Sequence, residues 1–212
     1  MDTQNINSIM YIPVELPFGK TIQQTSDGHS ITSDTAFLVE TVAHQISRKD
    51  INVLEMGSGN GIISIMLSHH HPNWKILGIE IQKHLVLLSR ENAKISETSP
   101  SFIEGDLTNY NSQIRFDLIV SNPPYFPIEE GRISPIQERA ISRHEIKCNM
   151  IDVLNCTKLN LIKGGKAFIL YPQSRWKDLN NFAKKVDLKV MKKFVLNSEM
   201  NKKKIIVELV HA

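Results

Sequence analysis

Short apolar runs alternate along the chain with segments whose apolar positions follow helical spacing. Apolar runs of four to eight residues are typical of buried strands, and the spacing i, i+3, i+4 is typical of helices. The pattern predicts strands at Ile51–Met56, Lys75–Glu80, Ser101–Glu104, Arg115–Ser121 and Lys166–Tyr171, and helices at Gly61–His70, Lys83–Ser96, Ile146–Leu161 and Ser174–Lys185. An earlier helix is expected to begin at Thr32 or Ser33, with Asp34 in its first turn, where a carboxylate suits the helix dipole.

The two ends of the chain break this alternation. Residues 1–30 are expected to be an irregular N-terminal extension, in which Met10–Leu16 and Lys20–Thr25 form a short hairpin. Near the other end, Leu188–Leu196 and Lys203–Val210 are strand-like runs with only a turn between them. We therefore expect an α/β fold with one domain over residues 31–212: a doubly wound, Rossmann-like sheet of seven strands, mostly parallel, with a C-terminal antiparallel hairpin.

Composition excludes several classes of protein. The 212 residues are 41% hydrophobic and 22% charged, which is ordinary for a globular protein, and a net charge of +3 does not by itself indicate a nucleic-acid partner. Two cysteines are too few for a disulfide framework or a zinc site, and we expect no metal. No signal peptide and no apolar run of about 18 residues is present, so we expect a cytoplasmic protein without membrane association.

A glycine-rich loop follows the first predicted strand of the sheet. It places Gly57, Gly59 and Gly61 at alternate positions before a helix, an arrangement that typically cradles a nucleotide-like ligand. A dinucleotide fingerprint would place its third glycine at position 62, where this chain has Ile62. Glu55 precedes the loop, and a carboxylate there would repel a pyrophosphate but tolerate a cationic sulfonium. These features favour S-adenosylmethionine over NAD.

Two more carboxylates follow the next predicted strands. Glu80 ends one strand, where a carboxylate can accept hydrogen bonds from both ribose hydroxyls. Asp106 follows the next strand and is a candidate acceptor for the adenine amino group of the cofactor. Because the ends of parallel strands meet at one edge of a sheet, these carboxylates support a nucleoside site there.

The string Asn122-Pro123-Pro124-Tyr125 follows another predicted strand directly. Two prolines, which lack an N–H and have a fixed φ, can continue neither a strand nor a helix. The string therefore predicts a stiff shelf with unpaired carbonyls and an aromatic ring, suited to a planar amide or amino-aromatic group.

With both motifs, the chain resembles class I S-adenosylmethionine-dependent methyltransferases that act on amino groups, and more narrowly the bacterial tRNA1(Val) (adenine-37-N6)-methyltransferase family. Four stretches carry the resemblance: Ser33–Leu38, Leu54–Ser64, Ser121–Phe126 and Arg139–Glu145. It implies the class I methyltransferase fold and methylation of an adenine N6 in tRNA, expected at position 37 of a valine tRNA. The C-terminal part matches the family only in pattern, and Glu55 stands where the family often has Asp.

The resemblance also assigns roles to residues. It implies that the Asn122 side chain and the Pro123 carbonyl accept the two hydrogens of the adenine amino group, with Pro124 completing the shelf and Tyr125 stacking on the base. Asn122 and Asp34 would also contact the cofactor, and Phe126, Arg139 and Arg143 would contact substrate. It implies neither a metal nor an obligate protein partner.

Five other functions compete with this prediction. A protein-glutamine methyltransferase uses the same motif on an amide, but usually carries a helical domain before the cofactor-binding domain. A DNA adenine methyltransferase usually carries a recognition domain, and ribosomal RNA guanine methyltransferases more often have Phe after the prolines. A non-catalytic binding module would be expected to lose Asn122 or the glycines, and a dehydrogenase leaves the Asn-Pro-Pro-Tyr string unexplained.

Overall fold

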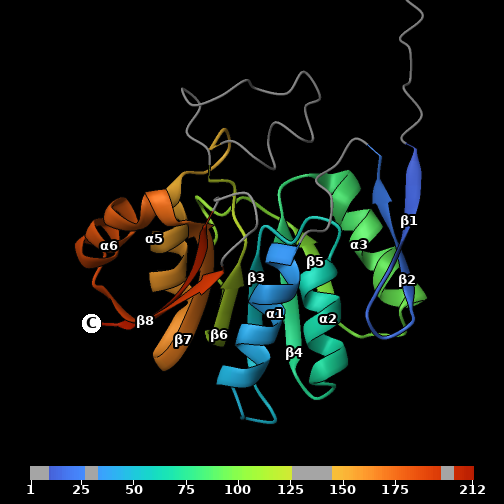
Figure 1. The fold of residues 1–212 in the computed structure, drawn as a ribbon, viewed down its shortest axis with the longest axis horizontal. Helices are drawn as coiled ribbons and strands as arrows, with labels where there is room; N and C mark the ends of the chain where they lie inside the picture. Colours follow the sequence, from blue (N-terminus) through green and yellow to red (C-terminus); the bar gives the residue numbers. More distant parts are fainter. Residues whose placement is uncertain (1–9, 27–32, 126–144, 197–202) are drawn as a thin grey trace, which may run out of the picture.

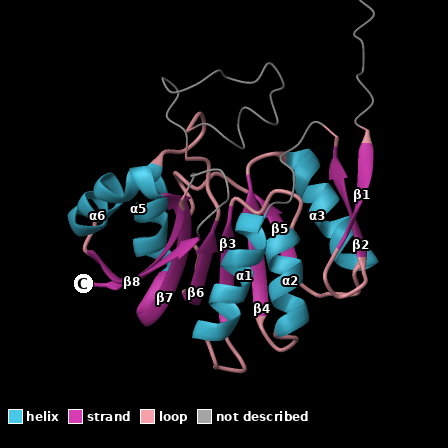
Figure 2. Cartoon of the chain, in the orientation of Figure 1, coloured by secondary structure: helices cyan, strands magenta, loops and turns pink. Residues whose placement is uncertain are grey.

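The computed structural model describes residues 10–26, 33–125, 145–196 and 203–212, in which strands and helices alternate (Figures 1 and 2). The strands are β1 (Tyr11–Glu15), β2 (Thr21–Thr25), β3 (Asn52–Met56), β4 (Lys75–Glu80), β5 (Ser101–Glu104), β6 (Phe116–Ser121), β7 (Leu161–Pro172), β8 (Leu188–Leu196) and β9 (Lys204–His211). The helices are α1 (Ser33–Gln45), α2 (Ile62–His70), α3 (Lys83–Ile95), α5 (Met150–Asn160) and α6 (Trp176–Lys185), with a 3₁₀ turn, η1 (Gln173–Arg175), before α6. Among the helices of these ranges, none is both long and apolar enough to cross a membrane.

Seven strands form one sheet in the order β5-β4-β3-β6-β7-β9-β8. The first five are parallel, and β9 runs antiparallel between β7 and β8. Helices α1, α2 and α3 pack on one face of the sheet and α5 and α6 on the other, each with a buried apolar cluster beneath (Figure 1). The predicted fold class is confirmed.

The chain reverses its direction of travel across the sheet at β3 and β6. From β3 it proceeds outward through β4 to β5, and it returns to β6 on the other side of β3. Met56, the last residue of β3, lies opposite Ser121, the last residue of β6, and the Ser121 hydroxyl donates to the Met56 carbonyl at 2.8 Å. Ligands of open α/β sheets bind at such a switch point. The glycine loop and the shelf therefore leave the sheet side by side.

A small hairpin, β1–β2, packs outside this sheet against α3 (Figure 2). Ile22 of β2 is fully buried, and the side chain of Asn92 in α3 bonds to both the N–H and the carbonyl of Gln23 at 2.8 Å. The same Asn92 amide donates to the Asn60 carbonyl of the glycine loop at 2.9 Å. One buried side chain thus fixes the hairpin and the loop relative to each other.

Two predicted boundaries are wrong for local reasons. The helix expected from Ile146 begins at Met150, because Asn149 and Asp152 form a capping box in which each side chain accepts from the other's backbone N–H. The strand expected from Lys166 begins at Leu161, which pairs with Phe116 before a register shift. Gly164 and Gly165 lie inside this strand and weaken its apolar pattern.

Candidate active site

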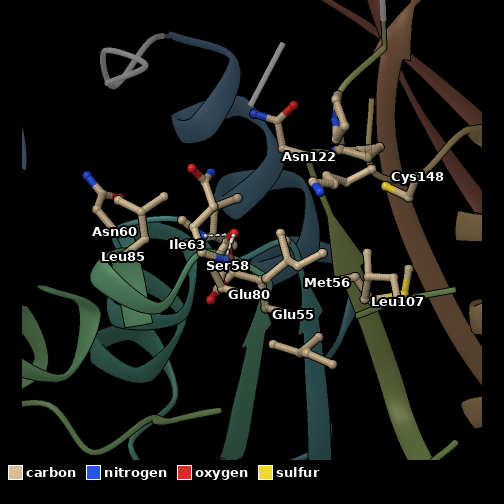
Figure 3. Close-up of a pocket in the computed structure, with 18 of the residues that line it drawn as sticks. Glu55, Met56, Ser58, Asn60, Ile63, Glu80, Leu85, Leu107, Asn122 and Cys148 are labelled. Atoms are coloured by element: carbon tan, nitrogen blue, oxygen red, sulfur yellow. Dashed lines mark hydrogen bonds between the residues drawn. The ribbon is translucent and has the colours of Figure 1, made fainter. Parts of the chain in front are cut away.

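A cavity opens at the carboxyl ends of β3, β4 and β6, where the glycine loop and the shelf emerge (Figure 3). In Figure 3, Asn122 and Cys148 lie at one side of the cavity and Asn60 and Leu85 at the other. Its walls include Gln24, Thr25, Thr35, Glu55, Met56, Gly57, Ser58, Gly59, Asn60, Glu80, Gln82, Leu85, Asp106, Leu107, Asn122, Pro123, Pro124 and Cys148. The first three residues bring the end of β2 and the start of α1 to the same site.

The three glycines of the loop have different environments. Gly57 and Gly59 line the cavity at φ 70° and 54°, and a Cβ at either position would meet no atom within 4 Å. Both therefore open onto space at a conformation that favours glycine. Gly61 is not among the lining residues, and a Cβ there would lie 2.8 Å from the Phe102 ring and 2.9 Å from Ser89 Cβ. Gly61 thus permits the loop to pack against α3 and β5.

Glu80 holds the glycine loop through a hydrogen bond and can still accept further hydrogen bonds. One carboxylate oxygen accepts from the Gly59 N–H at 2.9 Å and the other from the Gln82 N–H at 3.0 Å. Burial raises the pKa of Glu80. Each oxygen retains a second lone pair, so the carboxylate is preorganised for two neighbouring hydroxyls such as those of a ribose.

Asp106 and Ser58 supply further polar atoms to the cavity. One oxygen of Asp106 accepts from the N–H and hydroxyl of Thr108 at 2.9 and 2.8 Å, and within the described ranges the other makes no hydrogen bond. The Ser58 hydroxyl is buried without a partner in the same part of the chain. Buried polar atoms are normally paired, so these groups fit a ligand with polar functions, as a nucleoside cofactor has.

Glu55 does not present a free carboxylate to the cavity. Its side chain is 1% exposed and accepts hydrogen bonds from the backbone N–H and the hydroxyl of Ser64 in α2. Burial raises the pKa of Glu55 to about 8, although both Ser64 bonds act in the opposite direction. Because burial disfavours the ionised form and Ser64 occupies the carboxylate, this geometry does not provide the exposed negative charge on which the predicted repulsion of a pyrophosphate depends.

The shelf lies across the cavity from the glycine loop. Asn122, Pro123 and Pro124 line the wall, and the Asn122 side chain makes no hydrogen bond to any residue in the described ranges. Within those ranges, its amide oxygen and nitrogen therefore have no hydrogen-bond partner. Tyr125 is not a lining residue; Lys204 Nζ lies 3.6 Å from the centroid of its ring.

Arg175 of η1 holds the far end of the shelf. Its guanidinium donates to the Tyr125 carbonyl at 2.8 Å and pairs with Glu145 at 3.2 Å and Asp178 at 3.5 Å. Tyr125 and Glu145 border residues 126–144, so one largely buried side chain connects both sides of that segment. Sequence reasoning missed Arg175, which lies 50 positions from Tyr125 and in no recognised motif.

The structure brings most of the predicted site residues to one cavity and places others outside it. Glu55, Gly57, Gly59, Glu80, Asp106, Asn122, Pro123 and Pro124 surround one cavity. The Asp34 carboxylate instead lies 3.4 Å from Lys204 Nζ, beside Tyr125, and outside the lining. Phe126, Arg139 and Arg143 lie outside the described residues. No group of His, Cys, Asp and Glu within the described part of the chain could hold a metal ion.

A comparison with known families explains this combination. The sequence profile described as "Methyltransferase small domain" matches residues 28–143, more than half of the chain. The chain belongs to this family. The part of the family profile that matches includes both the glycine loop and the shelf.

Two methyltransferases of known function are similar to part of this chain. The release factor glutamine methyltransferase of Lactococcus lactis is 34% identical over 97 residues, 46% of this chain and 36% of that protein. The tRNA1(Val) (adenine(37)-N6)-methyltransferase of Porphyromonas gingivalis W83 is 33% identical over 138 residues, 61% of this chain and 53% of that protein. This chain thus spans a third to a half of these relatives.

The structural comparison supports the fold. The T. thermophilus 16S rRNA N2 G1207 methyltransferase, solved with AdoMet and guanosine, has a TM-score of 0.68 at 15% identity. The similarity covers 100% of this chain and 53% of that one. At this identity the likeness establishes the methyltransferase architecture alone.

The raised pKa of Glu55 predicts that stability falls as pH rises. Between the unfolded value of 4.5 and the folded value of about 8, the folded protein keeps a proton that the unfolded chain has lost. The free energy of unfolding should therefore decrease across this window, by at most about 4–5 kcal/mol. Urea unfolding at pH 5 and pH 8.5 measures the change. Glu55→Gln should make the free energy of unfolding less dependent on pH, and the dependence that remains would come from Glu80, whose pKa is also raised. Exposed Glu104→Gln is the control; parallel curves for Glu55→Gln and the wild type would contradict the assignment.

Arg175→Lys should lower the rate of methyl transfer, the reaction for which the family is named, without weakening cofactor binding. A lysine cannot reproduce the guanidinium fork that joins Tyr125, Glu145 and Asp178. Because a shift of about 1 Å at a reacting group can cost 100-fold, we expect kcat to fall about 10- to 100-fold. Arg48→Lys is the matched control, since Arg48 is itself an exposed arginine that pairs with a carboxylate, Asp117, and does not line the cavity. Equal losses in kcat and cofactor affinity would show that Arg175 stabilises the whole site instead.

Proposed function

We propose that the protein transfers a methyl group to the exocyclic N6 amino group of an adenine in tRNA, at position 37 of a valine tRNA. S-adenosylmethionine is the methyl donor, and when bound it supplies an electrophilic methyl group on a sulfonium. One observation supports the proposal. The Asn122 amide has no hydrogen-bond partner in the described ranges, and it lies across one cavity from a glycine loop that is hydrogen-bonded to Glu80.

The cofactor side of the site is proposed to use backbone and carboxylates together. Gly57 and Gly59 would let the ligand approach the loop closely, and Glu80 would accept both ribose hydroxyls. Asp106 would accept from the adenine amino group through its remaining oxygen. Glu55 would act indirectly, by holding the first turn of α2 below the loop.

The shelf is proposed to make the amino nitrogen more nucleophilic. The lone pair of an adenine amino group is delocalised into the ring, so the free amine is a weak nucleophile. If the Asn122 oxygen and the Pro123 carbonyl each accept one of its hydrogens, the nitrogen is drawn toward a pyramidal geometry and its lone pair is aimed at the methyl. The N–C bond would form as the S–C bond of the sulfonium breaks, S-adenosylhomocysteine would leave as a neutral thioether, and the methylated nitrogen would lose one proton to solvent. Catalysis of this kind relies on positioning and on oriented dipoles.

A base in this position must be unstacked from its neighbours, as in an anticodon loop. Tyr125 is the proposed stacking partner, with a contribution of about 1–3 kcal/mol. The Lys204 ammonium lies 3.6 Å from the centroid of this ring, so a stacked base would lie close to a positive charge. Phe126, Arg139 and Arg143 remain proposed substrate contacts.

A protein glutamine side chain is the second candidate substrate, because its amide presents the same planar NH₂ group. The L. lactis relative is named for this reaction. The alignment with the P. gingivalis tRNA methyltransferase is longer, 138 residues against 97, and this favours tRNA.

Labelled-methyl transfer tests the choice of substrate. Labelled S-adenosylmethionine is incubated with the protein and, separately, with bulk tRNA, ribosomal RNA, DNA or release factor protein lacking the modification. We expect label in tRNA, recovered as N6-methyladenosine after digestion. Label confined to protein glutamine would refute the proposal in favour of the second candidate.

Asn122→Ala should abolish transfer while cofactor binding is retained. The side chain accepts from the substrate amine in the proposed arrangement, and loss of a comparable positioned group lowers kcat about 100- to 1,000-fold. Single-turnover kinetics and calorimetric titration with S-adenosylmethionine measure the two effects separately. Asn109→Ala, at an exposed position near Asp106, is the control. Parallel loss of binding and transfer would indicate that Asn122 is structural.

A further inference from the structure

Charge is unevenly distributed between the two parts of the chain. The last 38 residues, 175–212, contain ten of the 25 Lys and Arg residues but only four of the 22 Asp and Glu residues. This segment carries a net charge of +6, so the preceding residues together carry −3. The small overall charge of +3 therefore conceals a strongly basic C-terminal part.

Seven exposed lysines of this part form what we call the lysine flank. Three lie on α6, three on β8 and one directly before β9; α6 packs against β8, the edge strand of the sheet (Figure 1). Within the described ranges, none of the seven makes an ion pair with a carboxylate, so their charge is not neutralised locally. The members are Lys177, Lys184, Lys185, Lys189, Lys192, Lys193 and Lys203. Lys193 faces Trp176 of α6, whereas Lys192 donates to the Gln45 side chain of α1 at 2.8 Å, on the other face of the edge strand.

The lysine flank begins at the shelf and runs away from it. Leu196 and Lys204 pair at the end of the sheet where Pro172 leads into Arg175, and Leu188 lies at the opposite end. Lys193 lies 4.7 Å from the centroid of the Trp176 ring, next to Arg175. Nine residues of strand span about 30 Å, so the flank is long enough to follow several phosphates of a nucleic acid.

Protection of an edge strand explains only part of this pattern. Lysines on an exposed edge prevent two sheets from pairing, and Lys189, Lys192 and Lys193 lie on the edge strand β8. The other four lie on α6 and at Lys203, where no edge needs protection. A solvated surface usually intersperses both signs of charge, whereas here seven exposed lysines accompany two exposed carboxylates, Asp178 and Asp187.

We infer that the lysine flank binds the phosphate backbone of the RNA whose adenine enters the site. The inference rests on the proposed function and adds where the rest of the substrate lies: along α6 and β8, from the shelf toward Lys189. Phosphate contacts of this kind set affinity and register without reading sequence.

Binding to bulk tRNA at NaCl concentrations from 50 to 300 mM tests the inference. Lys177, Lys189 and Lys193 are changed together to Gln, which keeps the packing of their stems. Loss of three phosphate contacts should weaken binding about 10- to 100-fold near 0.1 M salt and lower the slope of log K against log salt by about 2–3. The KM for tRNA should rise, and the affinity for S-adenosylmethionine should not change.

Two matched variants control for charge and for folding. Lys49, Lys75 and Lys94 are exposed elsewhere, and changing these three to Gln removes the same charge but should leave the salt slope unchanged. The triple Lys→Arg variant of the flank should retain wild-type binding and the wild-type melting temperature.

The possible results of these experiments distinguish a failure of the inference about the lysine flank from a failure of the proposed function. Methyl transfer to tRNA with unchanged affinity and slope in the flank variant would overturn the flank but leave the proposed function intact. Salt-sensitive tRNA binding through the flank, with label entering only protein, would refute the function instead. Weakened binding to anionic vesicles but not to tRNA would mean that the flank serves a membrane surface, and would also overturn the inference.

Discussion

The parallel pairing of β3 with β6 is the constraint on which the site depends. Met56 and Ser121 end their strands opposite each other, joined by the Ser121 hydroxyl, so two motifs 60 residues apart leave the sheet as neighbours. A slip of one residue would turn every buried side chain of the strand to the opposite face. Both faces of β3 and β6 are buried, so a slip would force the closely packed side chains of two apolar clusters to repack, and the packing that stabilises the fold also fixes the distance between loop and shelf.

Around that pairing, the site is held by polar side chains that bond to backbone. Glu80 fixes Gly59, Ser64 anchors Glu55, Asn92 ties the hairpin to Asn60, and Arg175 holds the Tyr125 carbonyl. Each bond joins elements distant in sequence. The arrangement leaves Asn122 and Ser58 without partners in the described structure, which concentrates unused hydrogen-bonding capacity where a ligand would lie.

The sequence predicts well those features that local pattern determines. Strand alternation gives the seven-stranded sheet, and the residues after each strand give most of the cavity wall, because ends of parallel strands must converge. It does not reveal Gln24, Thr25 or Arg175, which reach the site only through tertiary packing. It also does not show that Glu55 is buried beneath α2, where desolvation raises the pKa of its carboxyl. Asp34 suits a helix terminus by pattern, and its partner Lys204 comes from the far end of the chain.

The link through Arg175 joins two points of the chain that are 20 residues apart. One guanidinium connects the carbonyl of Tyr125 to the carboxylate of Glu145, so these two residues keep their relative positions whatever the number of residues between them. Doubling the number of residues between two fixed points adds only about 0.6 kcal/mol of closure entropy. The position of the shelf therefore depends on one side chain of η1 and only weakly on the length of chain that separates Tyr125 from Glu145.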